Sequence, residues 1–365
     1  PAPAALVRHA EQVAEITLQR LAKQGVPDAP HQPLLDEPIV TSEHGIPLRT
    51  PSPDAMKLLL KNSISPIPLH KSLVLFDVID EQCNESFTAH EKLALARALV
   101  FSISNLHFGP EVGVGKPKPD TAVVEPWLAN VRAMANDLEQ LSAAGLVHVP
   151  ARAIHADSRQ LLGQLGPASI DAVICSPPYP NEKDYTRTTR LETVLLGFAT
   201  SKAELQRIKR GLVRSNTRTV YVDDVDDRFV ESVPEIQRIA AEIEQRRIEL
   251  GKTSGFERLY HRVTRLYFGG MAKHFAELRI VLKPGAQLAY VVGDQASYLR
   301  VMIRTGQLLA QIAESLGYEV VSLDLFRTRL ATATREQLRE EVVVLRWPGG
   351  SNRYRTITGH VPRSV

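Results

Sequence analysis

Apolar residues recur at helical spacing through the first part of the chain. This spacing predicts helices over residues 4–24, 54–62, 69–82, 86–106 and 122–144. Gly25 follows the first helix and Gly145 follows the last, which favours helix ends there because glycine readily adopts the left-handed conformation found after a helix C-terminus. Residues 26–53 are rich in proline and predict an irregular linker.

From about residue 148 the pattern changes to short apolar runs that alternate with helical segments. Strands are predicted over residues 151–156, 171–175, 287–293, 319–326 and 340–347, and helices over residues 158–165 and 298–316. Such alternation is typical of parallel strands joined by crossover helices. The run at 171–175 is almost continuously apolar, which predicts a strand buried on both faces. A short polar segment joins the last two strands, so we expect them to form an antiparallel hairpin.

The composition indicates an ordinary soluble globular protein. Of the 365 residues, 44% are hydrophobic and 23% are charged. The two cysteines, Cys83 and Cys175, are too few for a disulfide framework or a metal cluster, so we expect no metal and a reducing, cytoplasmic location. No apolar run approaches the length of about 18 residues that suggests a membrane helix. The net charge is only +3, so a polyanion partner must meet a local basic surface.

Two features suggest nucleotide or metal binding but lack the required pattern. The stretch "GPEVGVGK", from Gly109 to Lys116, is too long for a phosphate loop, and Pro117 stands where such a loop has Ser or Thr. We therefore interpret it as a structural or substrate-facing loop. His155 has no partner at a metal-ligand spacing and is interpreted as an ordinary strand residue.

The apolar run at 171–175 is followed by Ser176, Pro177, Pro178 and Tyr179. The two prolines end the strand because they cannot donate a hydrogen bond to a sheet and they fix φ. The four residues are therefore predicted to form a stiff loop at the carboxyl end of a strand, where open α/β sheets bind their ligands. A plain Pro-Pro turn is the alternative interpretation.

The chemistry of this loop suits a nucleobase held by its exocyclic amine. The Ser176 hydroxyl and the Pro177 carbonyl can both accept hydrogen bonds from an –NH2 group, which favours a pyramidal nitrogen with an exposed lone pair. Tyr179 offers an aromatic face on which an unstacked base can rest. A base in a duplex must be flipped out to reach such a loop. We expect an activated methyl group as the electrophile, because no nucleophilic cysteine, metal cluster or Ser-His-Asp arrangement suggests another reaction.

A basic segment follows the loop. Between Lys183 and Arg218 the sequence has nine Lys or Arg residues and three Asp or Glu residues. Clustered bases can contact DNA phosphates, and we predict this role for Lys183, Arg187, Arg190, Arg207, Lys209 and Arg210. A solvated helix face is the alternative interpretation.

The stretch "ICSPPYPNEKDYTRTTRLE" resembles the catalytic motif of the DNA amino-methyltransferases, which modify cytosine N4 or adenine N6. The stretch "AIHADSRQLL" resembles the strand that precedes this motif in the family, and "LKPGAQLAYVVGD" resembles a later strand behind the target pocket. The stretches "GYEVVSLDLFRTR" and "EEVVVLRW" resemble the closing hairpin of the methyltransferase sheet. Together the resemblance covers about residues 148–347.

The resemblance implies an α/β fold: a Rossmann-like, S-adenosylmethionine-dependent methyltransferase sheet with a C-terminal antiparallel hairpin and helical insertions. It implies S-adenosyl-L-methionine as the cofactor, with Asp157 and Cys175 as cofactor-binding residues. The catalytic residues would be Ser176, Pro177, Pro178 and Tyr179. The partner would be double-stranded DNA, and a restriction or defence-system protein is a candidate second partner. The Ser form of the motif is most common among cytosine-N4 enzymes, so we expect cytosine N4, with adenine N6 as the alternative.

The resemblance also suggests how the chain is organised. We expect a mainly helical region at 1–147, a catalytic core at 148–347 with a DNA-recognising helical insertion at about 187–282, and a tail at 348–365. The family's glycine-rich cofactor motif, Asp-Pro-Phe-x-Gly-x-Gly, has no counterpart in the sequence. We expect that motif to lie N-terminal to this sequence or in a stretch not included in it. The alternative is a non-catalytic DNA-binding subunit that lacks the cofactor motif.

Overall fold

The computed structural model divides the chain into two compact units. It describes residues 1–28, 47–109, 111–146, 149–330 and 337–350. A helical unit comprises Pro1–Arg152 and Tyr185–Arg207, and a sheet unit comprises Ala153–Asp184 and Ile208–Val365. The chain thus leaves the sheet unit after Asp184 and returns to it at Ile208. Most of the predicted linker and most of the predicted tail lie outside the described residues.

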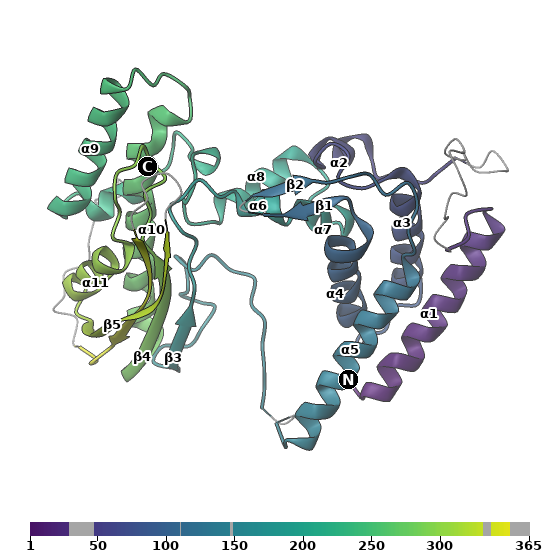
Figure 1. Ribbon diagram of the computed structural model, residues 1–365. Helices are drawn as coiled ribbons and strands as arrows, with labels where there is room; N and C mark the ends of the chain where they lie inside the picture. Colours follow the sequence, from purple (N-terminus) through teal and green to yellow (C-terminus); the bar gives the residue numbers. More distant parts are fainter. Residues whose placement is uncertain (29–46, 110, 147–148, 331–336, 351–365) are drawn as a thin grey trace, which may run out of the picture. The chain divides into compact units, whose positions relative to one another are not determined.

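The helical unit consists mainly of helices around one apolar core (Figure 1). Trp127 and Leu75 are fully buried in this core. The helices are α1 (Pro3–Lys23), α2 (Pro53–Leu58), α3 (Pro66–Glu81), α4 (Thr88–Ala98), α5 (Val124–Ala143), α6 (Tyr185–Thr188), α7 (Arg190–Leu195) and the first part of α8 (Lys202–Arg210), with a π-helical turn η1 (Leu99–Ile103) after α4.

The helices that apolar spacing predicts in the first part of the chain are confirmed, with ends that differ by several residues. Pro3, Pro53 and Pro66 stand in the first turns of α1, α2 and α3, where the missing N–H of proline costs no hydrogen bond. Gly25 and Gly145, which follow α1 and α5, have φ values of 68° and 71°, as their place after a helix end requires.

The stretch "GPEVGVGK" takes part in a small hairpin of the helical unit. Strand β1 (Leu106–Phe108) pairs in antiparallel fashion with β2 (Val112–Val114). The N–H of Gly115 then donates to the carbonyl oxygen of Asn105 at 2.7 Å, which closes the hairpin at its open end. These contacts give the stretch a structural role.

The sheet unit contains a small mixed sheet with the strand order β3-β4-β6-β5. Its strands are β3 (Ile170–Cys175), β4 (Leu282–Gly293), β5 (Glu319–Leu330) and β6 (Gln337–Arg346). β3 runs parallel to β4, whereas β6 runs antiparallel to both β4 and β5. The predicted antiparallel hairpin at the end of the chain is therefore confirmed, and the unit is of the mixed α/β class.

Helices cover one face of this sheet. Figure 1 shows α10 and α11 beside the strands. Alternate residues of β4, namely Leu288, Tyr290 and Val292, are buried in a core shared with α10 and α11. The helices of the unit are α9 (Pro234–Glu249), α10 (Tyr260–Val281) and α11 (Thr305–Ser315), with short 3-10 turns η2 (Thr217–Thr219), η3 (Asp226–Val230) and η4 (Glu257–Leu259).

The prediction of a strand over 151–156 and a helix over 158–165 is wrong, because these residues form coil and turns. His155 is accordingly an exposed coil residue and not a strand residue. A strand needs a neighbour for its backbone hydrogen bonds, and among the described strands β3 pairs with β4 only. Gly163, with a φ of 85°, interrupts the segment expected to be helical.

The prediction that residues 171–175 are buried on both faces is also wrong. Ile174 is 87% exposed. It pairs with Ala289 of β4, which pairs in turn with Val344 of β6, so the three side chains share the face opposite α10 and α11. Ala289 and Val344 are only partly buried. Within the described part of the chain, this apolar face of the sheet is not covered.

Gly269 of α10 has no room for a side chain, because a Cβ there would collide with the carbonyl oxygen of Asp226 in η3. We expect Gly269→Ala to lower the free energy of unfolding by about 3 kcal/mol, the upper end of the range for overpacking, since a backbone carbonyl cannot move aside as a side chain can. The measurement is urea denaturation followed by Trp347 fluorescence in a Trp127→Phe background, which leaves a single tryptophan, in the sheet unit.

Gly255→Ala is the matched control for this experiment. A Cβ at Gly255 would meet no atom within 4 Å, so this variant should unfold at nearly the parental urea concentration. Equal stability of the two alanine variants would contradict the close approach of α10 and η3.

Candidate functional site

The loop Ser176–Tyr179 follows β3 at the carboxyl end of the strand. Ser176 is exposed, and its hydroxyl forms no hydrogen bond with any described residue. Pro177 and Pro180 are buried, whereas Pro178 and Tyr179 are partly buried. The buried prolines therefore fix the loop while the serine hydroxyl stays accessible to a ligand.

The ring of Tyr179 lies against the end of the neighbouring strand. A Cβ on Gly293, the last residue of β4, would lie 3.2 Å from Cε2 of Tyr179 and 3.3 Å from Cγ of Glu340. Gly293 pairs with Glu340 of β6. The missing side chain at Gly293 thus allows the tyrosine ring to approach the carboxyl edge of β4, beside the hairpin.

A strained residue holds the segment that follows the loop. Glu182 has a φ of 68°, a conformation that costs a non-glycine residue about 1–3 kcal/mol. Its two carboxylate oxygens accept hydrogen bonds from the N–H and the hydroxyl of Thr217, each at 2.8 Å. Burial raises the pKa of Glu182, although the hydrogen bonds from Thr217 oppose this shift. The two bonds fix the path of the chain as it leaves the loop.

The partners of Glu182 are themselves tied to the core of the sheet unit. The N–H of Glu182 donates to the carbonyl oxygen of Ser215 at 3.3 Å, and the hydroxyl of Tyr298 donates to the same oxygen at 3.0 Å. Asn216 Nδ2 donates to the carbonyl oxygen of Lys183 at 3.2 Å. Tyr298 is fully buried and stacks on Tyr260, with ring centroids 4.8 Å apart. The loop is therefore connected to the core through a continuous set of hydrogen bonds.

His274 of α10 connects the coil before β3 to the sheet. Its Nδ1 lies 2.9 Å from the carbonyl oxygen of Ser158, and its Nε2 lies 2.8 Å from the hydroxyl of Tyr290. A carbonyl oxygen can only accept, so Nδ1 carries the proton and Nε2 accepts from Tyr290. Burial lowers the pKa of His274, which favours this neutral form. Tyr290 pairs with Cys175, so the contact ties Ser158 to the strands from which the loop emerges.

Arg159 is a buried arginine that joins three parts of the sheet unit. Its Nε and Nη2 donate to the two oxygens of Asp157 at 2.9 and 2.7 Å, and its Nη1 donates to Asp226 of η3 at 2.6 Å. Nη2 also donates to the carbonyl oxygen of Arg210 at 3.1 Å. A guanidinium has five N–H donors in one plane, so this side chain can hold the coil before β3, η3 and the end of α8 together.

Asp157 and Cys175, the residues predicted to contact the cofactor, both lie in the sheet unit. Burial by itself would raise the pKa of Asp157, but the hydrogen bonds and charge of Arg159 hold it below the usual value. Its carboxylate already accepts three hydrogen bonds from Arg159, of about four that it can accept. Burial raises the pKa of the Cys175 thiol. These two residues therefore do not by themselves form a site that fits S-adenosylmethionine.

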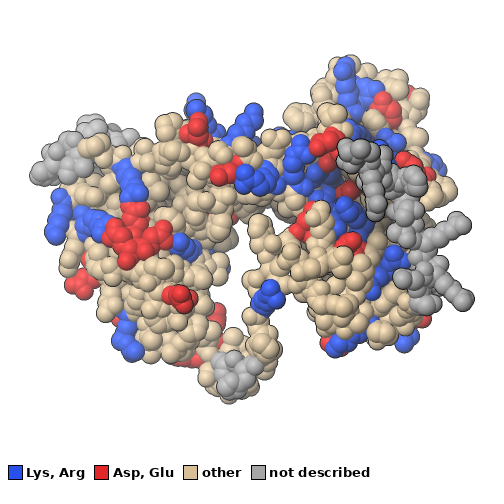
Figure 2. Space-filling view, turned by 180° about the vertical axis from the view of Figure 1, so that it is seen from behind, with Lys and Arg blue, Asp and Glu red and all other residues tan. Residues whose placement is uncertain are grey.

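The six basic residues predicted to contact DNA are divided between the units. Arg187, Arg190 and Arg207 belong to the helical unit, and Lys183, Lys209 and Arg210 belong to the sheet unit. Figure 2 shows Lys and Arg interspersed with Asp and Glu over the face in view. The six residues therefore do not form one basic surface on a single unit.

Several of these basic side chains make structural contacts. Arg190 donates to the carbonyl oxygens of Thr186 at 2.9 Å and Leu58 at 3.2 Å. Lys209 pairs with buried Asp184 at 3.2 Å. Arg210 pairs with Asp223 at 2.8 Å and lies over the ring of Tyr221, 4.3 Å from its centroid. By contrast, Arg207 is exposed and forms no ion pair with any described residue.

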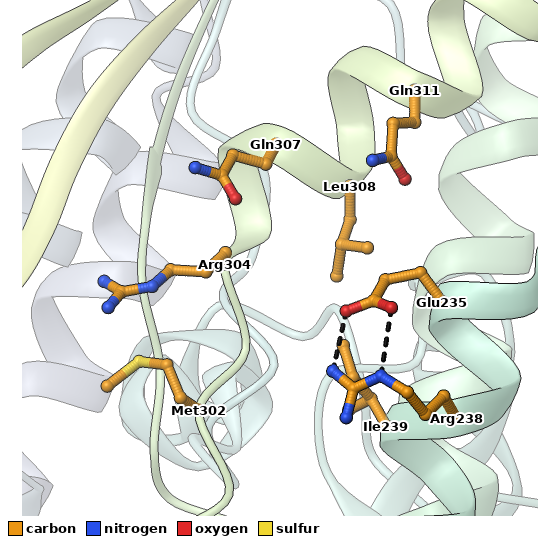
Figure 3. Close-up of a pocket in the computed structure, with 8 residues that line it drawn as sticks. All are labelled: Glu235, Arg238, Ile239, Met302, Arg304, Gln307, Leu308 and Gln311. Carbon is orange, nitrogen blue, oxygen red and sulfur yellow. Dashed lines mark hydrogen bonds and ion pairs between the residues drawn. The ribbon is translucent and has the colours of Figure 1, made fainter.

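A separate cavity of about 360 Å³ lies between α9 and the start of α11. Figure 3 shows the ion pair of Glu235 and Arg238 on one side of it, with Leu308 and Gln311 of α11 on the other. The lining residues are Glu235, Arg238, Ile239, Met302, Arg304, Gln307, Leu308 and Gln311. None of the residues predicted from the sequence lines this cavity, so we do not assign it to the candidate site.

The described residues hold no group of three or more His, Cys, Asp or Glu side chains placed to bind a metal ion. No described helix is both long and apolar enough to cross a membrane.

The sequence pattern does not identify four residues that hold the loop: Arg159, Glu182, His274 and Gly293. Gly293 stands at the end of a predicted strand, and Glu182 lies within the stretch that resembles the catalytic motif. Their positions in the sequence could therefore have indicated a role near the loop. The bond from His274 to Ser158 joins residues 116 positions apart, and that from Arg159 to Asp226 joins residues 67 apart. Contacts at such separations leave no local pattern in a single sequence.

The chain is distantly similar to type II DNA methyltransferases. It is 27% identical to the type II methyltransferase M.BsoBI of Geobacillus stearothermophilus over 238 residues, which cover 61% of this chain and 46% of that protein. It is also 27% identical to the type II methyltransferase M.AvaI of Nostoc sp. and of Anabaena variabilis over 212 residues, 53% of this chain and 42% of each relative. The chain therefore spans less than half the length of these curated relatives. No family model matches the chain, and no solved structure is significantly similar to it.

Arg159 should dominate the stability of the sheet unit. We expect Arg159→Met to lower the free energy of unfolding by about 3–5 kcal/mol, because it leaves Asp157 and Asp226 without their shared partner in a largely buried place. Arg238→Met is the matched control: Arg238 also pairs with two carboxylates, but it is 59% exposed, so solvent screens both pairs and its loss should change the free energy of unfolding little. Similar losses for the two variants would contradict the central role of Arg159.

The effect of Arg159→Met should depend on pH in one direction. The pKa of folded Asp157 is lowered, so its stabilising contribution is present above the unfolded value of about 3.9 and is lost as pH falls through the folded value. The stability difference between the parent and Arg159→Met should therefore shrink below about pH 4. Urea denaturation at several pH values measures it.

Proposed function

We propose that the protein is a site-specific DNA methyltransferase that methylates the exocyclic amine of a flipped base, with cytosine N4 as the favoured position. The observation that carries this proposal is the accessible Ser176 hydroxyl, held by buried prolines next to Tyr179 at the carboxyl edge of β3 and β4. The similarity to M.BsoBI and M.AvaI, both named type II methyltransferases, supports it.

In this proposal each loop residue has one task. The Ser176 hydroxyl and the Pro177 carbonyl accept hydrogen bonds from the target amine and orient its lone pair. Pro178 limits the movement of the loop. Tyr179 stacks on the flipped base, which contributes about 1–3 kcal/mol. Because the prolines and Glu182 already fix the loop, little reorganisation is needed when the base enters.

We propose S-adenosylmethionine as the methyl donor, bound at a site that polypeptide beyond the described residues completes. The uncovered apolar face around Ile174 supports this arrangement, because an exposed apolar patch usually marks a surface that packs against another segment or partner. Among the described strands, β3 pairs with β4 along one edge only. Its other edge offers a place for further strands. Asp157 and Cys175 would contribute to this cofactor site.

Two other functions are compatible with this loop. Adenine N6 carries the same kind of amine and would use the same acceptors. A non-catalytic DNA-binding subunit is favoured by one specific observation, the nearly saturated carboxylate of Asp157. Under either function the partner is double-stranded DNA in the cytoplasm, and a restriction or defence-system protein would accompany a restriction-modification enzyme.

The proposed activity is tested by nucleoside mass spectrometry. The protein, expressed at its full encoded length, is incubated with unmethylated DNA and isotopically labelled S-adenosylmethionine, and labelled N4-methylcytosine is the expected product. Ser176→Ala should lower the rate by about 10²-fold or more, as loss of one oriented polar group does in other active sites. Labelled N6-methyladenine would identify the alternative base. DNA binding without any labelled nucleoside would support the non-catalytic subunit.

Among the six residues predicted to contact DNA, Arg207 is exposed and forms no ion pair with any described residue, so it is free to meet phosphate. We expect Arg207→Gln to weaken binding to all duplex sequences alike and to make the negative slope of log K against log salt less negative by about 0.9. Arg190→Gln is the contrasting variant, because Arg190 is used on backbone carbonyls, and its loss should lower the melting temperature. Fluorescence anisotropy at several salt concentrations measures both. An unchanged slope in Arg207→Gln would make this residue part of a solvated helix face.

A further inference from the structure

A row of paired residues crosses the sheet at the edge where the loop lies. Gly293 of β4 pairs with Glu340 of β6, and Glu340 pairs with Arg327 of β5. Cross-strand pairs have side chains on the same face, and a Cβ at Gly293 would meet both the Tyr179 ring and the Glu340 side chain. Tyr179, Glu340 and Arg327 therefore share one face of the sheet at its carboxyl edge.

Arg329 belongs to the same group. It pairs in register with Leu338, two positions from Glu340 on β6, so it lies on the same face as Arg327. Arg327 Nε lies 2.5 Å from one oxygen of Glu340, and Arg329 Nε lies 3.5 Å from the other. One carboxylate thus serves two arginines and leaves an excess of one positive charge.

The carboxylate of this group is buried whereas its two guanidinium groups are partly exposed, which favours binding of an anionic ligand. The Glu340 side chain is only 9% exposed, whereas those of Arg327 and Arg329 are 65% and 40% exposed. The buried carboxylate therefore pairs with both guanidinium groups. Arg329 Nη2 also donates to the carbonyl oxygen of Asp294 at 3.3 Å. The exposed parts of both guanidinium groups keep N–H donors for a ligand. The hydrogen bond that Arg327 donates to Glu340 raises the pKa of Arg327, and the nearby Tyr179 adds to this shift.

We propose that Arg327 and Arg329 form a phosphate clamp that grips the DNA backbone at the nucleotide whose base stacks on Tyr179. The inference rests on the proposed function and adds to it a second set of phosphate contacts, separate from the basic segment that follows the loop. A planar guanidinium matches the geometry of a phosphate with two parallel hydrogen bonds. Glu340 fixes both groups before DNA arrives, so little side-chain entropy is lost on binding.

The clamp is tested by DNA binding measured at several salt concentrations. The slope of log K against log salt is negative, and Arg327→Gln and Arg329→Gln should each make it less negative by about 0.9. Single variants are used because the remaining arginine still pairs with Glu340, so the carboxylate is not left buried alone. Arg327→Lys should keep the parental slope, since it keeps the charge, but should bind more weakly because it cannot make the paired hydrogen bonds.

Arg346→Gln is the matched control. Arg346 lies at the other end of the same hairpin, is 49% exposed, and pairs with a carboxylate, Glu319, at 3.0 Å. It lies away from the loop edge, so its loss should change neither the affinity nor the slope. Melting temperatures of all variants confirm that the sheet unit is folded.

A second comparison locates the clamp at the flipped nucleotide. A duplex with one mismatched cytosine releases that base more easily than a fully matched duplex. The loss of affinity in Arg327→Gln should therefore be greater on the mismatched duplex. Equal affinity and slope for Arg327→Gln, Arg329→Gln and Arg346→Gln would overturn the clamp, while parental DNA binding would leave the proposed function standing. A parent chain that does not bind DNA would instead contradict the proposed function itself.

Discussion

The buried guanidinium of Arg159 is the interaction on which the arrangement of the candidate site depends. A buried charge is costly unless it is paired and hydrogen-bonded, and Arg159 meets this condition through Asp157, Asp226 and the carbonyl oxygen of Arg210. These partners come from the coil before β3, from η3 and from the end of α8. The same carboxylate of Asp226 lies close to Gly270 of α10, so η3, α10 and the arginine pack as one layer.

The loop itself combines rigidity with access. Buried prolines and the strained backbone at Glu182 fix its path, and strain of this kind persists only where the surroundings over-determine the conformation. Thr217 supplies that constraint through two hydrogen bonds. Ser176 is left exposed at the end of a rigid strand, which is the condition that a pair of amine acceptors needs.

The parts of the fold that depend on local patterns could be predicted from the sequence. The helices of the helical unit follow apolar spacing, and the antiparallel hairpin of β5 and β6 follows from two apolar runs separated by a short segment. The coil over 151–156, where apolar spacing predicts a strand, could not be predicted, because a strand forms only beside a partner that the pattern does not reveal. The exposure of Ile174 depends in the same way on which face the helices cover. The roles of the basic residues could not be predicted either. Arg190 and Arg207 occur in the same basic segment, but Arg190 donates to the carbonyl oxygen of distant Leu58, whereas Arg207 is exposed.

The uncovered face of the sheet links folding to the proposed chemistry. Ile174, Ala289 and Val344 form an apolar row on that face, and such a row is unfavourable in water unless something packs against it. Tyr179 and Glu340 lie on the same face, at the carboxyl edge of the same strands. A segment that covered the apolar row would therefore lie near the loop, on the face that carries Tyr179. Under the proposed function, one segment that packs against the sheet beside the unpaired edge of β3 would both cover this face and complete the cofactor site.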